Sequence, residues 1–116
     1  MMKRRISEAE GLPLIQRYCE GDVLSPTQLR TAVRFALEEF SERYPGKSVE
    51  IRIPWIGATQ AIAGINHRRG TPPNVVEMDG QTWLALTTGI ANLPLQPAAI
   101  TYSGTRADLS PYLPIF

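Results

Sequence analysis

The 116-residue chain has few of the residues that form reactive sites. It contains one cysteine, Cys19, and one histidine, His67. A single cysteine excludes an intramolecular disulfide and fits a reducing compartment. One histidine and one distant cysteine form neither a set of zinc ligands nor a Cys–His dyad. We therefore expect no metal site, no catalytic residue and no cofactor.

The sequence also lacks an excess of either charge. Twelve Lys and Arg residues stand against eleven Asp and Glu residues, which gives a formal net charge of +1. Domains that bind nucleic acid usually carry a clear basic excess. The near balance of charge therefore argues against a nucleic-acid partner.

Long apolar runs are missing as well. No window approaches the ~20 apolar residues of a membrane span. No apolar segment of signal-peptide length follows the basic N-terminus. We expect a cytoplasmic protein without a membrane span. Hydrophobic residues make up 43% of the chain, enough for one core, and we expect residues 1–116 to form a single domain.

The clearest helical signal covers residues 25–44. Ser25 and Gln28 form an S-x-x-Q capping box, and apolar residues then recur at three- to four-residue steps. We expect exposed pairs with i,i+4 spacing on the other face, Arg34 with Glu38 and Glu39 with Arg43. Weaker patterns predict helices over residues 7–20 and 79–88, the latter opened by Asp79 and closed by Gly89.

Four segments have the character of strands. Residues 48–53 alternate between apolar and polar side chains. Residues 57–64 have mostly small side chains, and residues 74–77 include two β-branched valines. Residues 98–102 form the fourth predicted strand. Because the strands cluster between helical segments, the pattern favours an α+β fold with a mostly antiparallel sheet.

Several segments resemble the bacterial branch of the sterol carrier protein family. The similar stretches are Thr31–Glu39, Val49–Pro54, Arg69–Glu77, Thr82–Leu86 with Gly89, and Ser103–Leu109. The resemblance implies about five strands with helices packed on one face. It also implies an apolar pocket between sheet and helices that accepts acyl chains or sterol-like lipids. The chain departs from the eukaryotic carriers in lacking a peroxisomal signal and a long apolar C-terminal helix.

The apolar residues of the predicted sheet and of the helix at 79–88 are the candidate lining of that pocket. The same residues also fit a completely filled core, because a pocket is a core left incompletely packed. The set consists of Val49, Ile51, Ile53, Ile62, Val76, Trp83, Leu86, Ile100 and Tyr102. His67, Arg69 and Glu77 are the candidate polar residues at the pocket mouth, where an arginine fork can hold a carboxylate.

Three functions are compatible with these patterns. The first is a non-catalytic module that binds a small apolar ligand. The second is a stand-alone relative of the domain associated with thiol-dependent isomerases of the maleylpyruvate type, with His67, Arg69 and Glu77 at a polar site. The third is a structural or protein-interaction domain with a filled core and an exposed, Pro-rich tail over residues 112–116. The patterns leave open whether the chain forms a homo-oligomer.

Overall fold

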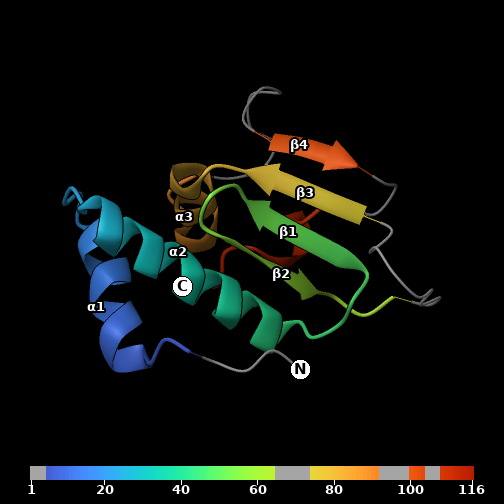
Figure 1. Ribbon diagram of the computed structural model, residues 1–116, viewed down its shortest axis with the longest axis horizontal. Helices are drawn as coiled ribbons and strands as arrows, with labels where there is room; N and C mark the ends of the chain where they lie inside the picture. Colours follow the sequence, from blue (N-terminus) through green and yellow to red (C-terminus); the bar gives the residue numbers. More distant parts are fainter. Residues whose placement is uncertain (1–4, 65–73, 92–99, 104–107) are drawn as a thin grey trace.

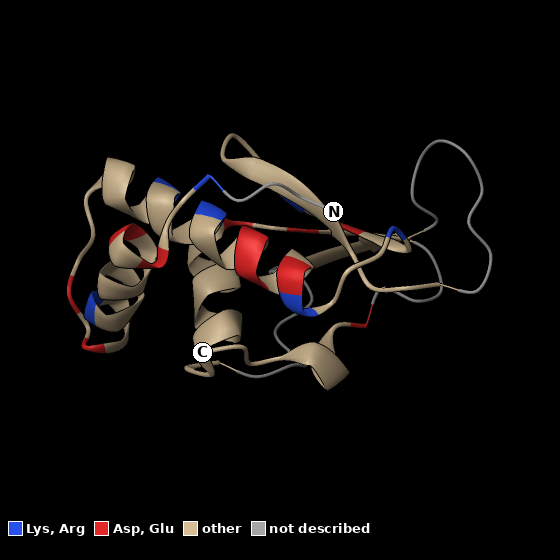
Figure 2. Cartoon of the chain, turned by 90° about the horizontal axis from the view of Figure 1, so that it is seen from below, with Lys and Arg blue, Asp and Glu red and all other residues tan. Residues whose placement is uncertain are grey.

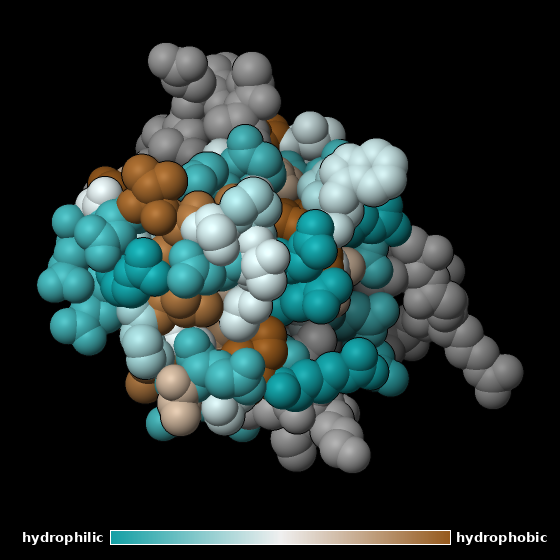
Figure 3. All heavy atoms as spheres, turned by 60° about the vertical axis from the view of Figure 1, so that its left-hand side comes forward, coloured by the Kyte–Doolittle hydropathy of each residue, from teal (hydrophilic) through white to brown (hydrophobic). Residues whose placement is uncertain are grey.

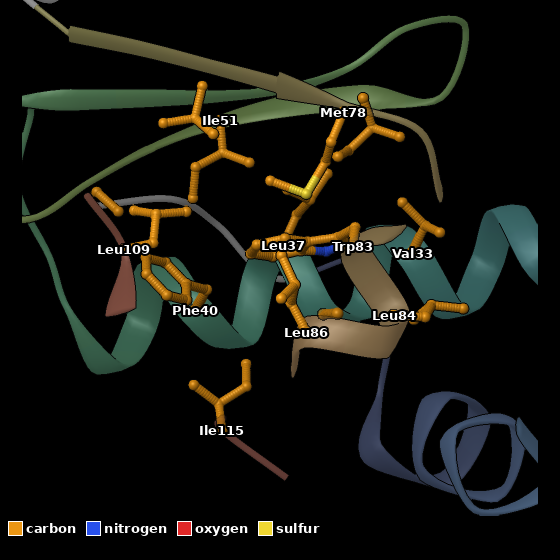
Figure 4. Packing of buried hydrophobic residues seen from close by; sticks show 14 of the residues in the cluster. Val33, Leu37, Phe40, Ile51, Met78, Trp83, Leu84, Leu86, Leu109 and Ile115 are labelled. Carbon is orange, nitrogen blue, oxygen red and sulfur yellow. The ribbon is translucent and has the colours of Figure 1, made fainter. Parts of the chain in front are cut away.

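Helices cover one face of a sheet. The computed structural model describes residues 5–64, 74–91, 100–103 and 108–116, and within these it contains three α-helices and four strands (Figure 1). A close view of the core has the sheet on one side and the helices on the other (Figure 4). The α+β class expected from the sequence is therefore confirmed. No helix in the described ranges is long and apolar enough to cross a membrane.

Each helix begins at a residue whose side chain accepts a backbone hydrogen bond. The helices are α1 (Glu8–Cys19), α2 (Pro26–Arg43) and α3 (Gly80–Thr88). At the start of α2, the predicted capping box forms in both directions between Ser25 and Gln28. Asp79 accepts from the Thr82 N–H at 2.7 Å, and Gly89 ends α3 with a left-handed φ of 80°. Local capping chemistry thus sets these helix ends.

The sheet is mixed, which corrects the expected topology. Its strands are β1 (Val49–Ile53), β2 (Gly57–Ala61), β3 (Asn74–Met78) and β4 (Ile100–Ser103), in the order β2-β1-β3-β4. The β1–β2 and β3–β4 pairs are antiparallel, whereas β1 and β3 are parallel. The expectation of a mostly antiparallel sheet of about five strands was therefore slightly wrong, because four strands are described and the central pair is parallel.

Helix α2 forms the centre of the core. Its buried apolar residues pack toward α1, α3 and the sheet, and they are Ala32, Val33, Phe35, Ala36, Leu37 and Phe40. Side chains from β1 and β3, such as Ile51 and Met78, point down from the sheet toward this helix (Figure 4). The opposite sheet face carries polar residues such as Glu50 and Arg52, and no described element covers it.

The C-terminal residues are part of the core, which corrects the idea of an exposed tail. Ile115 is only 4% exposed, and the Phe116 ring stacks on Phe35 with centroids 5.9 Å apart. The backbone N–H groups of both residues donate to the Thr87 carbonyl, at 2.9 and 3.0 Å. The end of the chain thus ties α2 to α3, with Ile115 buried and Phe116 half-buried.

Gly11 allows α1 to approach α2 closely. A Cβ at this position would lie 2.2 Å from the ring of Phe35, well inside van der Waals contact. We predict that Gly11→Ala destabilises the protein by ~1–3 kcal/mol through overpacking, although alanine is the better helix former by ~1 kcal/mol. Urea unfolding of the two proteins measures the difference.

The matched control is Ala9→Gly, at an exposed position of the same helix. It reports helix propensity without a packing change, and we expect a loss of ~1 kcal/mol. If Gly11→Ala were stabilising, the close packing of α1 on Phe35 would be contradicted.

Candidate functional site

Most residues of the predicted apolar lining lie in the interior between the sheet and the helices. Strands β1, β3 and β4 contribute five of them, and α3 contributes the other two. Their exposed fractions run from 0% to 7%, and the residues are Val49, Ile51, Ile53, Val76, Trp83, Leu86 and Ile100. The structure thus brings these side chains together in one cluster.

Two residues of that set lie at its margin. Ile62 follows β2 and is half-buried against the core cluster. Tyr102 is 47% exposed, although it pairs in register with the fully buried Val76. Tyr102 belongs to the edge strand β4, where the described helices no longer cover the sheet. Partial burial and the nearby Asp108 carboxylate both raise the pKa of the Tyr102 phenol.

Trp83 carries an unpaired donor inside the apolar cluster. The side chain is 0% exposed, and its indole Nε1 has no hydrogen-bond partner among the described residues. The ring packs edge-on against Phe40 with centroids 5.6 Å apart. In the close view its nitrogen lies in apolar surroundings between the sheet and α2 (Figure 4). Burying such a donor without an acceptor costs ~1–3 kcal/mol.

Of the three residues predicted at the polar mouth, the structure describes only Glu77. His67 and Arg69 lie outside the described residues. Glu77 lies on β3 between Val76 and Met78, which are both buried. Because side chains alternate along a strand, Glu77 points to the opposite sheet face, away from Trp83. It is half-buried there and pairs in register with Arg52 of β1.

A cleft opens at the surface between α2, the start of β2 and the N-terminal segment. Its volume is about 440 Å³, within the range of small-molecule sites. The inner wall is apolar and includes Leu37, which also belongs to the buried cluster that contains Trp83. Arginine side chains stand at the rim. The lining consists of Arg5, Ile6, Arg34, Leu37, Glu38, Ile56, Gly57 and Ala58.

Glu38 and Arg34 hold the walls of this cleft in place. The Glu38 carboxylate accepts from the backbone N–H groups of Arg5 and Ile6, at 3.2 and 3.1 Å. Arg34 donates from Nε to the Ile56 carbonyl at 3.0 Å. Glu38 is only 7% exposed, so the expectation of an exposed Arg34–Glu38 pair was wrong. Tertiary contacts with the N-terminal segment cover this face of α2.

A second, larger cleft of about 810 Å³ lies between the C-terminal half of α2 and β2. Six of its nine lining residues have polar side chains, and the lining consists of Ser41, Glu42, Pro45, Gly46, Lys47, Glu50, Ala58, Thr59 and Gln60. The Ser41 hydroxyl donates to the Gln60 carbonyl at 2.9 Å and so joins the two walls. Within the described ranges, no three His, Cys, Asp or Glu side chains are grouped as metal ligands would be.

Sequence reasoning missed the smaller cleft. Its residues come from the N-terminal segment, one helix face and one hairpin, which lie far apart along the chain. The only local signal was the position of Glu38 in α2. It directly follows Leu37 and so lies at the edge of the apolar stripe that faces the core. A carboxylate at the edge of an apolar stripe can indicate a tertiary hydrogen-bond partner. The pattern could not identify that partner as the backbone of residues 5 and 6.

Residues 25–115 match the protein-family model described as "Bacterial SCP ortholog". The match begins at the N-cap of α2 and ends within the C-terminal segment that packs against α3. It therefore covers the sheet, α2 and α3, and leaves α1 outside. No curated protein sequence matches the chain.

The hydrogen bonds of Glu38 generate a prediction about the N-terminal segment. We expect Glu38→Ala to lower the free energy of unfolding by about 2 kcal/mol, because hydrogen bonds to a charged acceptor contribute ~1.5–3 kcal/mol. Amide hydrogen exchange at Arg5 and Ile6 should accelerate at the same time. Glu38→Gln keeps an acceptor oxygen and should lose less stability.

Arg30→Ala serves as the comparison, since Arg30 is exposed on the same helix. Exposed substitutions usually stay within ~0.5 kcal/mol. Unchanged exchange at residues 5 and 6 in Glu38→Ala would show that Glu38 does not hold the segment.

Proposed function

The chain belongs to the bacterial sterol carrier protein family, and from this premise we propose that it binds an apolar ligand with one polar head group. A fatty acyl chain is the ligand class that fits best. The ligand occupies the space between the sheet and helices α2 and α3, with its head group at Trp83. The protein holds this molecule and performs no chemistry on it.

The observation that carries the proposal is that the Trp83 N–H has no hydrogen-bond partner among the described residues and lies in an apolar interior. A buried donor without an acceptor is unfavourable, and buried tryptophans usually find a partner. A carboxyl, carbonyl or hydroxyl oxygen of a lipid would provide that acceptor. An apolar tail on the same molecule would match the side chains around the indole. One donor in an apolar enclosure is typical of small-molecule sites, where few polar groups fix the orientation.

The smaller cleft is the proposed entrance. Leu37 lines this cleft and also belongs to the buried cluster, so it separates the surface from the interior around Trp83. Displacement of this one side chain would open a path from the cleft toward the indole. Arg34 and Arg5 at the rim suit an acid head group during entry, because guanidinium groups match carboxylate oxygens.

The energies are compatible with moderate affinity. A ten-carbon chain gains roughly 8 kcal/mol gross, at ~0.8 kcal/mol per buried methylene. Association and ordering oppose this gain by ~4–15 kcal/mol. Relief of the unpaired donor at Trp83 adds ~1–3 kcal/mol. The head-group contact therefore decides whether a short acyl chain binds measurably, and affinity should depend strongly on chain length.

The first test is native mass spectrometry with fatty acids of graded length. We expect one ligand per chain, with an affinity that increases about fourfold per methylene. Fluorescence provides an independent readout, because Trp55→Phe leaves Trp83 as the sole tryptophan of the chain. An unliganded mass at every chain length would contradict the proposal and favour a filled core.

The second test separates the head group from the tail. In Trp83→Phe we expect a uniform loss of about fivefold across all chain lengths, which corresponds to one hydrogen bond of ~1 kcal/mol. The gain per methylene should stay unchanged. Isothermal titration measures both quantities. Leu84→Val is the control for lost core volume on the same helix, and an equal uniform loss in that variant would refute a specific role for the indole N–H.

A further inference from the structure

The turn between β1 and β2 presents a tryptophan to solvent. Trp55 is 97% exposed, whereas the other tryptophan of the chain, Trp83, is fully buried. The turn is closed by a hydrogen bond from the Ile56 N–H to the Ile53 carbonyl at 3.0 Å. Pro54 and Trp55 are its two central residues. Trp55 therefore gains almost nothing from burial in the folded chain.

The backbone at Trp55 is also unfavourable for a tryptophan. Its φ is 69°, in the left-handed region that costs an L-residue roughly 1–2 kcal/mol. Glycine or asparagine usually occupies the third position of a turn with this geometry. Trp55 therefore lowers the stability of the fold in two ways, because its large ring is exposed to solvent and its backbone is strained. Backbone strain that is not compensated by packing occurs often at functional positions.

The exposed charges around this turn are arginines. Arg34 donates to the Ile56 carbonyl, and Arg5 lines the cleft beside residues 56–58. Arg52 lies on β1 just before the turn and is ion-paired with Glu50. The nearby carboxylates are less accessible: Glu38 is buried, and Glu50 and Glu77 are half-buried.

The distribution of charge along α2 points the same way. Its N-terminal half carries Arg30 and Arg34 and no acidic residue, while the C-terminal half carries Glu38, Glu39 and Glu42 and ends at Arg43 (Figure 2). The turn packs near the basic half of α2, because Gly57 lies beside Arg34. Ile56 approaches Gly80 at the start of α3, which also contacts this half of α2 through Val33. The hairpin tip therefore sits in the basic region of the molecule.

Among the described residues, the face that carries the turn shows no broad apolar patch. The turn lies on the left in Figure 1, and this side comes forward in Figure 3. Hydrophobic residues reach that face as separate patches among hydrophilic ones (Figure 3). Stable protein interfaces bury roughly 800 Å² per partner around an apolar centre. A lone protruding indole among cations instead suits the headgroup region of a bilayer, where tryptophan is enriched.

We infer that the β1–β2 hairpin tip, with Trp55 at its point and Arg5, Arg34 and Arg52 around it, docks on the surface of an anionic lipid bilayer. The indole enters the headgroup region, and the guanidinium groups contact lipid phosphates. The docked tip brings the adjacent cleft to the membrane. This inference goes beyond the proposed ligand binding. It depends on Trp55 and Arg52, which that proposal does not use, while Arg5 and Arg34 are common to both.

Vesicle binding tests the inference. The protein is Trp83→Phe, in which Trp55 is the only tryptophan, and the vesicles are phosphatidylcholine with about a third phosphatidylglycerol. We expect the Trp55 emission to move to shorter wavelength on binding. Trp55→Gly in the wild-type background should bind at least roughly tenfold more weakly in co-sedimentation. Arg52→Gln should lose about fivefold at low salt, and added salt should weaken binding further.

Two comparisons keep the test specific. Trp55→Gly relieves the left-handed strain, so it should unfold at the same or a higher urea concentration, and weaker vesicle binding is then not due to misfolding. Val23→Gly removes another apolar side chain, 91% exposed outside the hairpin, and should bind vesicles normally. Equal losses in both variants, or no loss in Trp55→Gly, would overturn the inference.

The outcomes also distinguish this inference from the ligand proposal. Trp55→Gly should bind fatty acids in solution as the wild type does. Fatty-acid binding without vesicle binding would overturn the docking inference alone. Vesicle binding without fatty-acid binding would support docking and contradict the ligand proposal. A change in oligomeric state of Trp55→Gly, without vesicle binding, would overturn docking in favour of contact between two copies of the chain.

Discussion

The packing of Phe40 is the interaction on which the rest of the structure depends. Its ring is fully buried and contacts Trp83 of α3, Tyr44 at the end of α2 and Tyr112 near the C-terminus, with centroids 5.6, 5.2 and 6.4 Å away. Three parts of the chain thus meet at one side chain of α2. Edge-to-face contacts of this kind fix the orientation of rings as well as their separation. With α2 fixed across the sheet, the position of α3, of the C-terminal segment and of the cleft along α2 follows.

This packing also explains why the core and the proposed ligand site share residues. The helices cover one face of the sheet, and the buried side chains of β1 and β3 face them. A domain of this size has one interior, so an apolar ligand can be enclosed only by competing with those side chains. The unpaired donor of Trp83 is an imperfection in that interior. Natural cores seldom retain such a group without a reason, and this makes Trp83 the natural focus for binding experiments.

Local patterns predicted the elements well and their pairing less well. The capping box at Ser25, the alternation in β1 and the glycine at the end of α3 are signals that neighbouring residues encode, and all three were confirmed. The parallel β1–β3 pair was not anticipated, because an alternating strand has the same pattern in either direction. The burial of Glu38 was missed for a related reason. Its partners are backbone groups more than thirty residues away, and no local pattern reports them.

The sequence by itself determined the class of fold, the ends of the helices, most of the apolar set that lies in the interior and the similarity to the bacterial sterol carrier protein family. These properties depend on side-chain type and on spacing within single elements. Only the tertiary structure decided which groups were left unsatisfied or exposed. Trp83 is buried with no acceptor in the described part of the chain, and Trp55 projects from a strained turn, yet both are tryptophans that follow short strands. The difference arises because one indole lies beneath the sheet and the other at its tip, and position relative to the sheet is a property of the assembled chain.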